Sequence, residues 1–211
     1  MKQFRNISTL IFDLGGVLIN LEKSNCIKAF NQLGFMNIEN YLDNFQHKGI
    51  FIALEKGEIS TETFISELMK ECPHASTHNQ IKQAWCAYLL DIPREKLELL
   101  VQLRKRFRVI MLSNTNGIHF PFISHTQFEA QGYTIEQCFD KCYLSHELKS
   151  AKPDGLVFEK LLAAENTPPN ECLFLDDGIK NIEKATEYGI QTYHVSERED
   201  LSFLSNPTTW I

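Results

Sequence analysis

The sequence has 211 residues and a formal net charge of -6 at pH 7, with 21 Lys and Arg residues against 27 Asp and Glu residues. Hydrophobic residues make up 43% and charged residues 23%, which is typical of a globular chain and excludes a disordered one. This length suits one large domain, or a domain that carries a second small one. The acidic balance argues against nucleic acid as a partner. An anionic small molecule fits this charge if a metal ion or a lysine reverses the field at its site.

The cysteines and the apolar runs indicate the cellular compartment of the protein. The six cysteines form no CxxC pair and no zinc-finger spacing, so we interpret them as reduced thiols, mostly small core residues. The apolar run 10–19 follows Lys2 and Arg5 as in a signal peptide, but Asp13 interrupts it and no small-residue cleavage site follows. No stretch reaches the ~20 apolar residues of a membrane helix. We therefore expect a cytoplasmic protein without membrane contact.

Short apolar runs that end in glycine or polar residues recur along the chain and predict buried strands. The first covers 7–13 and stops at two glycines, and the others cover 107–112, 138–144, 172–175 and 190–195, of which 138–144 is the weakest. Helical patterns lie between them at 94–106, 154–164 and 179–188. Strands that alternate with helices predict an α/β fold, a Rossmann-like parallel sheet covered by helices on both faces.

The segment 20–91 breaks this alternation, because it offers successive helical patterns and no convincing apolar strand. One of its helices is predicted to begin after Ser60, with Glu62 in the first turn, where the helix dipole favours an acidic residue; the preceding residues 54–60 are predicted as a loop. We therefore predict an α/β core domain made of residues 1–19 and 92–211, and a helical cap domain, residues 20–91, inserted after the first strand.

Polar residues just beyond the predicted strands form one set, because ligands of an open parallel sheet bind at the carboxyl ends of its strands. The set comprises Asp13 with Gly15 and Gly16, Ser113 with Asn114, the pair Asp176 and Asp177, and Lys152, which opens a helix after the third strand. Taken singly, Asp13 could cap a turn, Ser113 could end a strand, Lys152 could be solvated and either aspartate could cap a helix. Together, carboxylates, a lysine and a hydroxyl suit phosphoryl transfer with Mg²⁺, which prefers oxygen ligands.

Four segments resemble, in order, the four motifs of the haloacid dehalogenase superfamily. They are FDLGGVL (12–18), LSNTN (112–116), KPD (152–154) and LDDG (175–178) followed by Asn181. The resemblance covers the whole chain, including a cap after the first strand. The segments EKGEIS (55–60), 112–116 and YLS (143–145) more narrowly resemble the branch that contains bacterial α-D-glucose-1-phosphate phosphatase.

The resemblance implies catalytic and metal-binding roles. Asp13 would be the nucleophile that forms an aspartyl-phosphate, and it would also bind Mg²⁺. The main-chain carbonyl of Gly15 would be a second metal ligand. Asp177 would bind the ion directly, with Asp176 nearby or acting through water.

The resemblance also implies how the phosphoryl group is held. Leu14, Gly15, Ser113 and Asn114 would contact it, and Lys152 would neutralise charge on it and on Asp13. Ser113 and Lys152 thus join Asp13 as candidate catalytic residues. Asn181 would orient these groups from the following helix.

Gly15 departs from the family pattern, because most phosphatases of the superfamily carry there an aspartate that protonates the leaving group and then activates water. A sugar 1-phosphate expels an anomeric oxygen that is more acidic than an ordinary alcohol and gains less from a general acid. His119 and His47 are candidate substitutes for the missing carboxyl, although each is also compatible with a surface or packing role.

We therefore expect a Mg²⁺-dependent phosphatase acting on a small phosphorylated metabolite, a sugar phosphate such as a sugar 1-phosphate. Alternatives are a phosphomutase or phosphotransferase of the same superfamily, or a non-catalytic phosphate-binding protein that has lost the acid/base group. A metal-free dehalogenase is disfavoured by the paired Asp176 and Asp177. Phe45, Ile50 and Phe51 could face the substrate or form the core of the cap. The oligomeric state does not follow from the sequence.

Overall fold

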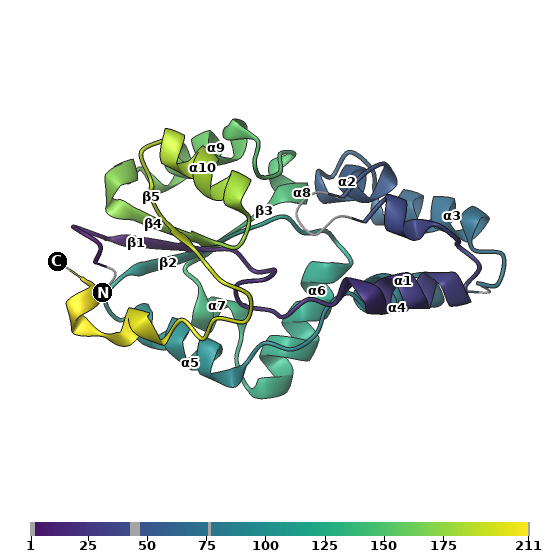
Figure 1. Cartoon of the computed structure of the whole chain (residues 1–211), viewed down its shortest axis with the longest axis horizontal. Helices are drawn as coiled ribbons and strands as arrows, with labels where there is room; N and C mark the ends of the chain where they lie inside the picture. The colour runs from purple at the N-terminus through teal and green to yellow at the C-terminus, as the bar shows by residue number, and fades with distance from the viewer. Residues whose placement is uncertain (1–2, 43–46, 76, 211) are drawn as a thin grey trace.

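A computed structural model of the chain describes residues 3–42, 47–75 and 77–210 (Figure 1). Five parallel strands form one sheet in the order β3-β2-β1-β4-β5. Their bounds are β1 Thr9–Phe12, β2 Arg108–Ser113, β3 Lys141–Leu144, β4 Cys172–Asp176 and β5 Gln191–His194. The central strand β1 pairs Phe12 with Met111 of β2 and with Leu175 of β4, so three carboxyl ends meet at one edge. The predicted parallel α/β sheet is confirmed.

Helices cover both faces of the sheet (Figure 1). On one face lie α5 (Arg94–Leu103), α6 (His119–Ile123) and α7 (Ile135–Cys138), and on the other lie α9 (Gly155–Glu165) and α10 (Ile179–Glu187). Because side chains alternate along a strand, Leu10 and Phe12 pack into the cluster on the α5 face, whereas Ile11 packs against the α9 face. Each core strand is therefore buried on both sides, as its continuous apolar run predicts.

Some predicted boundaries were wrong. The strand predicted at 138–144 begins only at Lys141, because Thr134 forms a capping box with Gln137 and starts the short helix α7. The loop predicted at 54–60 begins late, since Leu54 and Glu55 end helix α2. The helix predicted after Ser60 is confirmed as α3, and the Ser60 hydroxyl accepts the Thr63 N–H at 3.1 Å. The short helices α6 and α8 (Ser145–Leu148) were not predicted.

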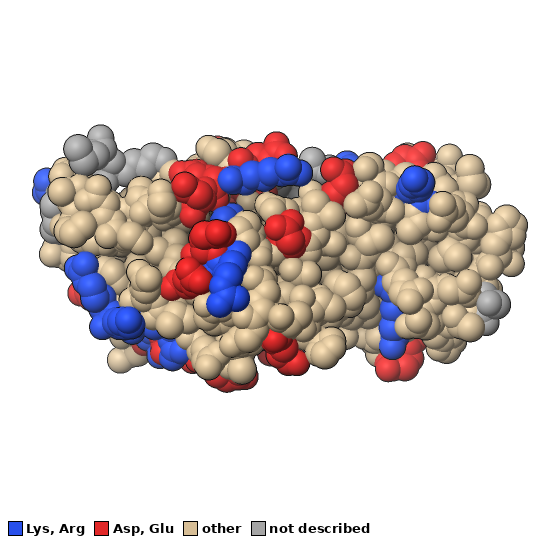
Figure 2. Space-filling model, turned by 90° about the horizontal axis from the view of Figure 1, so that it is seen from below, with Lys and Arg blue, Asp and Glu red and all other residues tan. Residues whose placement is uncertain are grey.

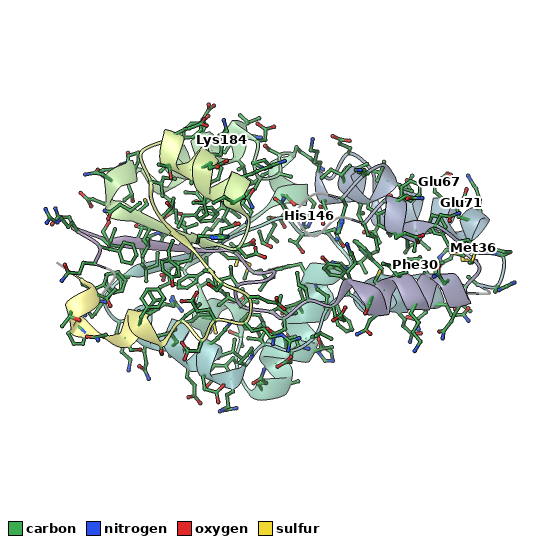
Figure 3. All side chains as sticks on the ribbon, in the orientation of Figure 1. Phe30, Met36, Glu67, Glu71, His146 and Lys184 are labelled. Carbon is green, nitrogen blue, oxygen red and sulfur yellow. The ribbon has the colours of Figure 1, made fainter. Side chains whose placement is uncertain are left out.

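The first four α-helices after β1 form a second lobe, to the right in Figure 1. They are α1 (Lys23–Gln32), α2 (Ile50–Glu55), α3 (Thr61–Glu71) and α4 (His78–Cys86). This lobe has its own apolar cluster, in which Phe30, Phe51 and Trp85 are wholly buried. In Figure 3, Phe30 points from α1 into the lobe. Ile50 packs at the edge of the cluster, and Phe45 lies outside the described residues.

The chain enters and leaves this lobe through two paired segments. The Asn20 N–H donates to the Asp91 carbonyl at 2.9 Å, and the Leu90 N–H donates to the Asn20 carbonyl at 2.9 Å. Leu21 and Leu89 form an antiparallel bridge between them. We propose that residues 20–91 are the cap and that residues 1–19 and 92–211 are the core, with this paired linker as the boundary.

Short turns of 3-10 or π helix complete the chain: Ile38–Asn40, Ser124–Phe128, Glu129–Gln131, Pro169–Glu171, Ser202–Ser205 and Pro207–Thr209. Figure 2 shows a face on which basic and acidic side chains lie interspersed. Arg104 and Asp140 form an ion pair of 2.6 Å. All six cysteines are free, and five are buried.

In the described ranges, the structure contains no helix with both the length and the apolar character needed to cross a membrane.

Candidate active site

Asp13 directly follows the central strand, and two main-chain contacts fix it there. Its N–H donates to the Leu175 carbonyl of β4 at 2.9 Å, which continues the β1–β4 pairing beyond the strand. Its Oδ1 accepts the Leu14 N–H at 2.6 Å, while Oδ2 lies 2.8 Å from the Lys152 ammonium. Leu14 is buried, and Asp13 is the acceptor for its main-chain N–H. The carboxyl group is held at the edge of the sheet in one orientation.

Lys152 lies between two carboxylates at the centre of the site. Its Nζ is 2.8 Å from Asp13 Oδ2 and 2.6 Å from Asp176 Oδ2, and its side chain is 1% exposed. Burial lowers the pKa of Lys152, but the charges of Asp13 and Asp176 outweigh burial, so its pKa lies above the ordinary value. Lys152 is therefore a buried, charged ammonium group.

Asp176 and Asp177 have different surroundings although they are adjacent in the chain. Both carboxylate oxygens of Asp176 are engaged: Oδ2 accepts from Lys152, and Oδ1 accepts the Gly178 N–H at 2.7 Å and the Asn181 amide at 2.9 Å. Asp177 is half-buried and lines the cavity beside Asp13. Asp177 thus faces the cavity, whereas Asp176 is surrounded by protein donors.

Three carboxylates form a cluster suited to a hard cation. Oxygen atoms of Asp13, Asp176 and Asp177 lie within 4.8 Å of one another. Burial raises the pKa of Asp13 well above its ordinary value; Lys152 opposes this shift, and Asp176 and Asp177 add to it. Burial also raises the pKa of Asp177 to about 6, with the Asp176 charge adding to the effect. All donors are oxygen atoms and a positive charge would relieve the repulsion, so the set fits Mg²⁺.

The two glycine positions after Asp13 differ in the room that they leave for a side chain. Gly16 has φ of +70°, and a Cβ there would lie 2.1 Å from Asp177 Oδ2, so only glycine leaves room for that carboxylate. Gly15 has no positive φ, and a Cβ there would meet only Leu21 Cδ1, at 3.2 Å. The backbone at position 15 is therefore compatible with a larger side chain.

The second motif contributes Ser113 and Asn114 at the end of β2. Both line the cavity. The Asn114 side chain makes a double contact with the main chain of Lys152: its Nδ2 donates to the Lys152 carbonyl at 2.9 Å, and its Oδ1 accepts the Lys152 N–H at 2.8 Å. The Asn114 side chain therefore holds Lys152 in place. This role competes with the phosphoryl contact expected of Asn114, because both use the same side chain.

A single cavity of about 90 Å³ joins these residues to the second lobe. The core supplies Asp13, Leu14, Gly15, Ser113, Asn114, Lys152, Asp177 and Asn181 to its lining. The second lobe supplies His47 and Glu55, and α6 supplies His119. Every residue that the sequence singled out for phosphate or metal lies at this cavity, with the exception of Asp176, which lies behind Lys152.

The sequence did not indicate Glu55 as a site residue. Glu55 ends α2, is 7% exposed and lies with Oε1 3.6 Å from His47 Nε2. Burial raises its pKa to about 8, against the charge of Lys152. The sequence of residues 55–60 indicated only a resemblance to a phosphatase branch and gave Glu55 no role. A glutamate at the end of a short amphipathic helix carries no local signal that it faces inward.

The chain is similar to known proteins over most of its length. The model of the family described as "haloacid dehalogenase-like hydrolase" matches residues 7–189. A D-ribitol-5-phosphate phosphatase of Bacteroides thetaiotaomicron is 31% identical over 204 residues, which cover 95% of this chain and 99% of that protein.

Solved structures are similar over nearly the whole chain. A haloacid dehalogenase family enzyme of Bacteroides thetaiotaomicron, solved as an aspartate-to-alanine variant with magnesium and inorganic phosphate, is 39% identical with a TM-score of 0.91, covering 95% of this chain and 99% of that one. A hydrolase of the same family from Porphyromonas gingivalis is 35% identical with a TM-score of 0.85, covering 92% of this chain and 93% of that one.

Proposed function

The chain belongs to the haloacid dehalogenase-like hydrolases, and on that premise we propose that it is a Mg²⁺-dependent phosphatase of a small sugar or polyol phosphate. The observation that carries this proposal is the buried Asp13, Lys152 and Asp176 cluster with Asp177 beside it. Such a set combines a nucleophile, a cation for the phosphoryl oxygens and ligands for a hard metal ion. The similar enzyme with magnesium and phosphate bound supports the metal and the reaction class.

Asp13 is the nucleophile in this mechanism. Its oxygen attacks phosphorus, the bond from phosphorus to the leaving oxygen breaks, and an aspartyl-phosphate forms on Asp13. Water then attacks phosphorus and releases phosphate from Asp13. Lys152 compensates the negative charge of Asp13 and of the phosphoryl group, and Ser113 donates to a phosphoryl oxygen. Because the Leu14 N–H fixes Oδ1 of Asp13, the nucleophile needs no reorientation before attack.

Asp13, Asp177 and the Gly15 carbonyl hold Mg²⁺, and Asp176 supports them through Lys152 and Asn181. When bound, the ion supplies positive charge that keeps Asp13 ionised beside an anionic substrate. The room that Gly16 leaves for Asp177 fits this role, because a side chain at position 16 would displace the carboxylate.

Two substrate classes have support. The relative named for D-ribitol 5-phosphate favours a polyol phosphate with a primary alcohol as the leaving group. Gly15 favours a sugar 1-phosphate, because the acidic anomeric oxygen gains less from the carboxyl that Gly15 lacks. The narrower likeness to the α-D-glucose-1-phosphate phosphatase branch stays a prediction.

A screen of phosphorylated metabolites with Mg²⁺ and with EDTA tests the function. We expect phosphate release with Mg²⁺ and none with EDTA, and no turnover or trapped phosphoenzyme in Asp13→Asn. An isomerised sugar phosphate would indicate the mutase alternative, and binding without turnover would indicate a non-catalytic phosphate-binding protein. An Asp13→Asn variant within about tenfold of the parent rate would exclude the covalent mechanism.

A further inference from the structure

We propose that Glu55 of the second lobe is the group that protonates the leaving oxygen and then deprotonates the attacking water, in place of the carboxyl missing at Gly15. This inference rests on the phosphatase function proposed above. It names a catalytic residue from outside the four motifs, on a helix about forty residues along the chain from Asp13.

Glu55 and the nucleophile share the same cavity. Glu55 lines it from the lobe side, whereas Asp13, Ser113 and Lys152 line it from the core side. The titratable groups that face Glu55 are His47 from the segment before α2, Lys152 from the core and His119 from α6. A substrate whose phosphorus lies at Asp13 would therefore extend into the cavity that Glu55 also lines.

The other candidates in the cavity are less suited to proton transfer. His119 Nε2 lies 3.1 Å from the Trp85 carbonyl, which can only accept, so this nitrogen carries the proton. Its ring stacks on Trp85 at 4.3 Å, and burial lowers its pKa to about 3. Asp177 is assigned to the metal. Glu55 is thus the remaining carboxyl among the described residues of the cavity lining, with His47 beside it as a partner.

The backbone around Glu55 is fixed to the core. The Ser145 hydroxyl of α8 donates to the Glu55 carbonyl at 2.6 Å, and the Lys149 ammonium donates to the Gly57 carbonyl at 2.6 Å. A Cβ at Gly57 would lie 2.2 Å from the His146 carbonyl, so the two backbones are in close contact there. In Figure 3, His146 lies between the sheet and the second lobe. These contacts hold Glu55 at a defined place relative to Asp13.

The proton balance closes over the cycle. In the first step, Asp13 bonds to phosphorus, the leaving oxygen keeps the electron pair of the broken bond, and the protonated Glu55 carboxyl gives that oxygen its proton. In the second step, the Glu55 carboxylate takes a proton from water as the water oxygen bonds to phosphorus and the bond to Asp13 breaks. Phosphate leaves, and both side chains return to their starting forms. The raised pKa of Glu55, about 8, keeps the acid form available at neutral pH.

The test compares two leaving groups in Glu55→Gln. Ribitol 5-phosphate expels a poor alkoxide, and 4-nitrophenyl phosphate expels an acidic phenolate that needs no proton. We expect kcat/KM for the alkyl ester, which covers the steps up to formation of the aspartyl-phosphate, to fall about 10²- to 10³-fold, and kcat/KM for the aryl ester to fall much less. We also expect the decline of alkyl ester turnover above about pH 8 to disappear. Glu58→Gln, which changes an exposed glutamate three residues away, is the control and should alter neither rate.

A conservative variant separates chemistry from packing. Glu55→Asp keeps the carboxyl and should retain part of the alkyl ester activity that Glu55→Gln loses. Equal losses of kcat/KM on both esters, or no loss on either, would each overturn the proton-transfer role. If the parent protein releases phosphate from no ester in the screen, the proposed phosphatase function fails instead, so the two failures are distinguishable.

Discussion

At the scale of single residues, the adjacent aspartates Asp176 and Asp177 should respond differently to removal of charge. Asp176→Asn leaves the wholly buried Lys152 with one carboxylate partner, and we expect a loss of about 3–5 kcal/mol in the free energy of unfolding. Asp177→Asn removes the proposed metal ligand that faces the cavity, so the Mg²⁺ concentration for half-maximal activity should rise at least about tenfold. Urea unfolding and Mg²⁺ titration of activity measure these effects. If Asp177→Asn caused the greater loss of stability and Asp176→Asn the greater rise in the Mg²⁺ requirement, the two assignments would be exchanged.

Gly15 offers a second test at this scale, because nothing in its backbone demands glycine. Gly15→Asp supplies a carboxyl two residues after the nucleophile. In the Glu55→Gln background, we expect it to raise kcat for ribitol 5-phosphate by about tenfold or more, since a second group can then protonate the alkoxide. Gly15→Ala in the same background is the control for the contact with Leu21 and should give no gain. A loss of activity in Gly15→Asp equal to that in Gly15→Ala would show that the new carboxyl does not reach the leaving group.

At the scale of elements, the contact between the end of α2 and α8 sets the position of Glu55. Gly57→Ala would place a Cβ 2.2 Å from the His146 carbonyl, so the end of α2 must move away from the core. We expect kcat/KM for alkyl phosphates to fall more than kcat/KM for aryl phosphates. Gly132→Ala is a matched control, because Gly132 also has a positive φ, of +82°, but its Cβ would meet no atom within 4 Å. If both variants lose the same activity, backbone strain and not the α2–α8 contact is responsible.

For the whole molecule, the clustered carboxylates link stability to pH and Mg²⁺. The pKa of Asp177 is raised to about 6 in the folded chain, and the pKa of Asp13 is raised as well, so folding favours their protonated forms. Their contribution to stability is present at low pH and is lost as pH rises through the folded-state pKa of each. At the proposed metal site, Mg²⁺ would bind the ionised carboxylates and offset this loss.

We therefore expect Mg²⁺ to raise the melting temperature more at pH 8 than at pH 5, and Asp177→Asn to reduce that difference. Thermal unfolding with Mg²⁺ and with EDTA at both pH values measures it. Asp154→Asn, which changes an aspartate that caps α9 and accepts the Leu156 N–H, is the control. A shift of equal size at both pH values would argue against coupling between the metal and the raised pKa values.

The sequence by itself determined the sheet and the residues at its edge. Continuous apolar runs predict buried parallel strands, and the parallel arrangement brings Asp13, Ser113 and the Asp176 and Asp177 pair together, since each directly follows or ends such a run. The sequence predicted the boundaries of helices and strands less accurately than their presence, because capping contacts such as that of Thr134 depend on a few side chains.

Only the tertiary structure decided how these residues divide the work of the site. The bond of Asn114 to the main chain of Lys152, the ion pair of Asp176 with Lys152, the bond of His119 to the Trp85 carbonyl and the inward position of Glu55 all involve contacts between segments that are distant in the chain. Glu55, for example, is fixed by Ser145, ninety residues further along the chain. The hydrophobic periodicity of α2 places Phe51 in the lobe core, but it carries no information on which polar side chain faces another lobe, because that depends on packing across the cavity.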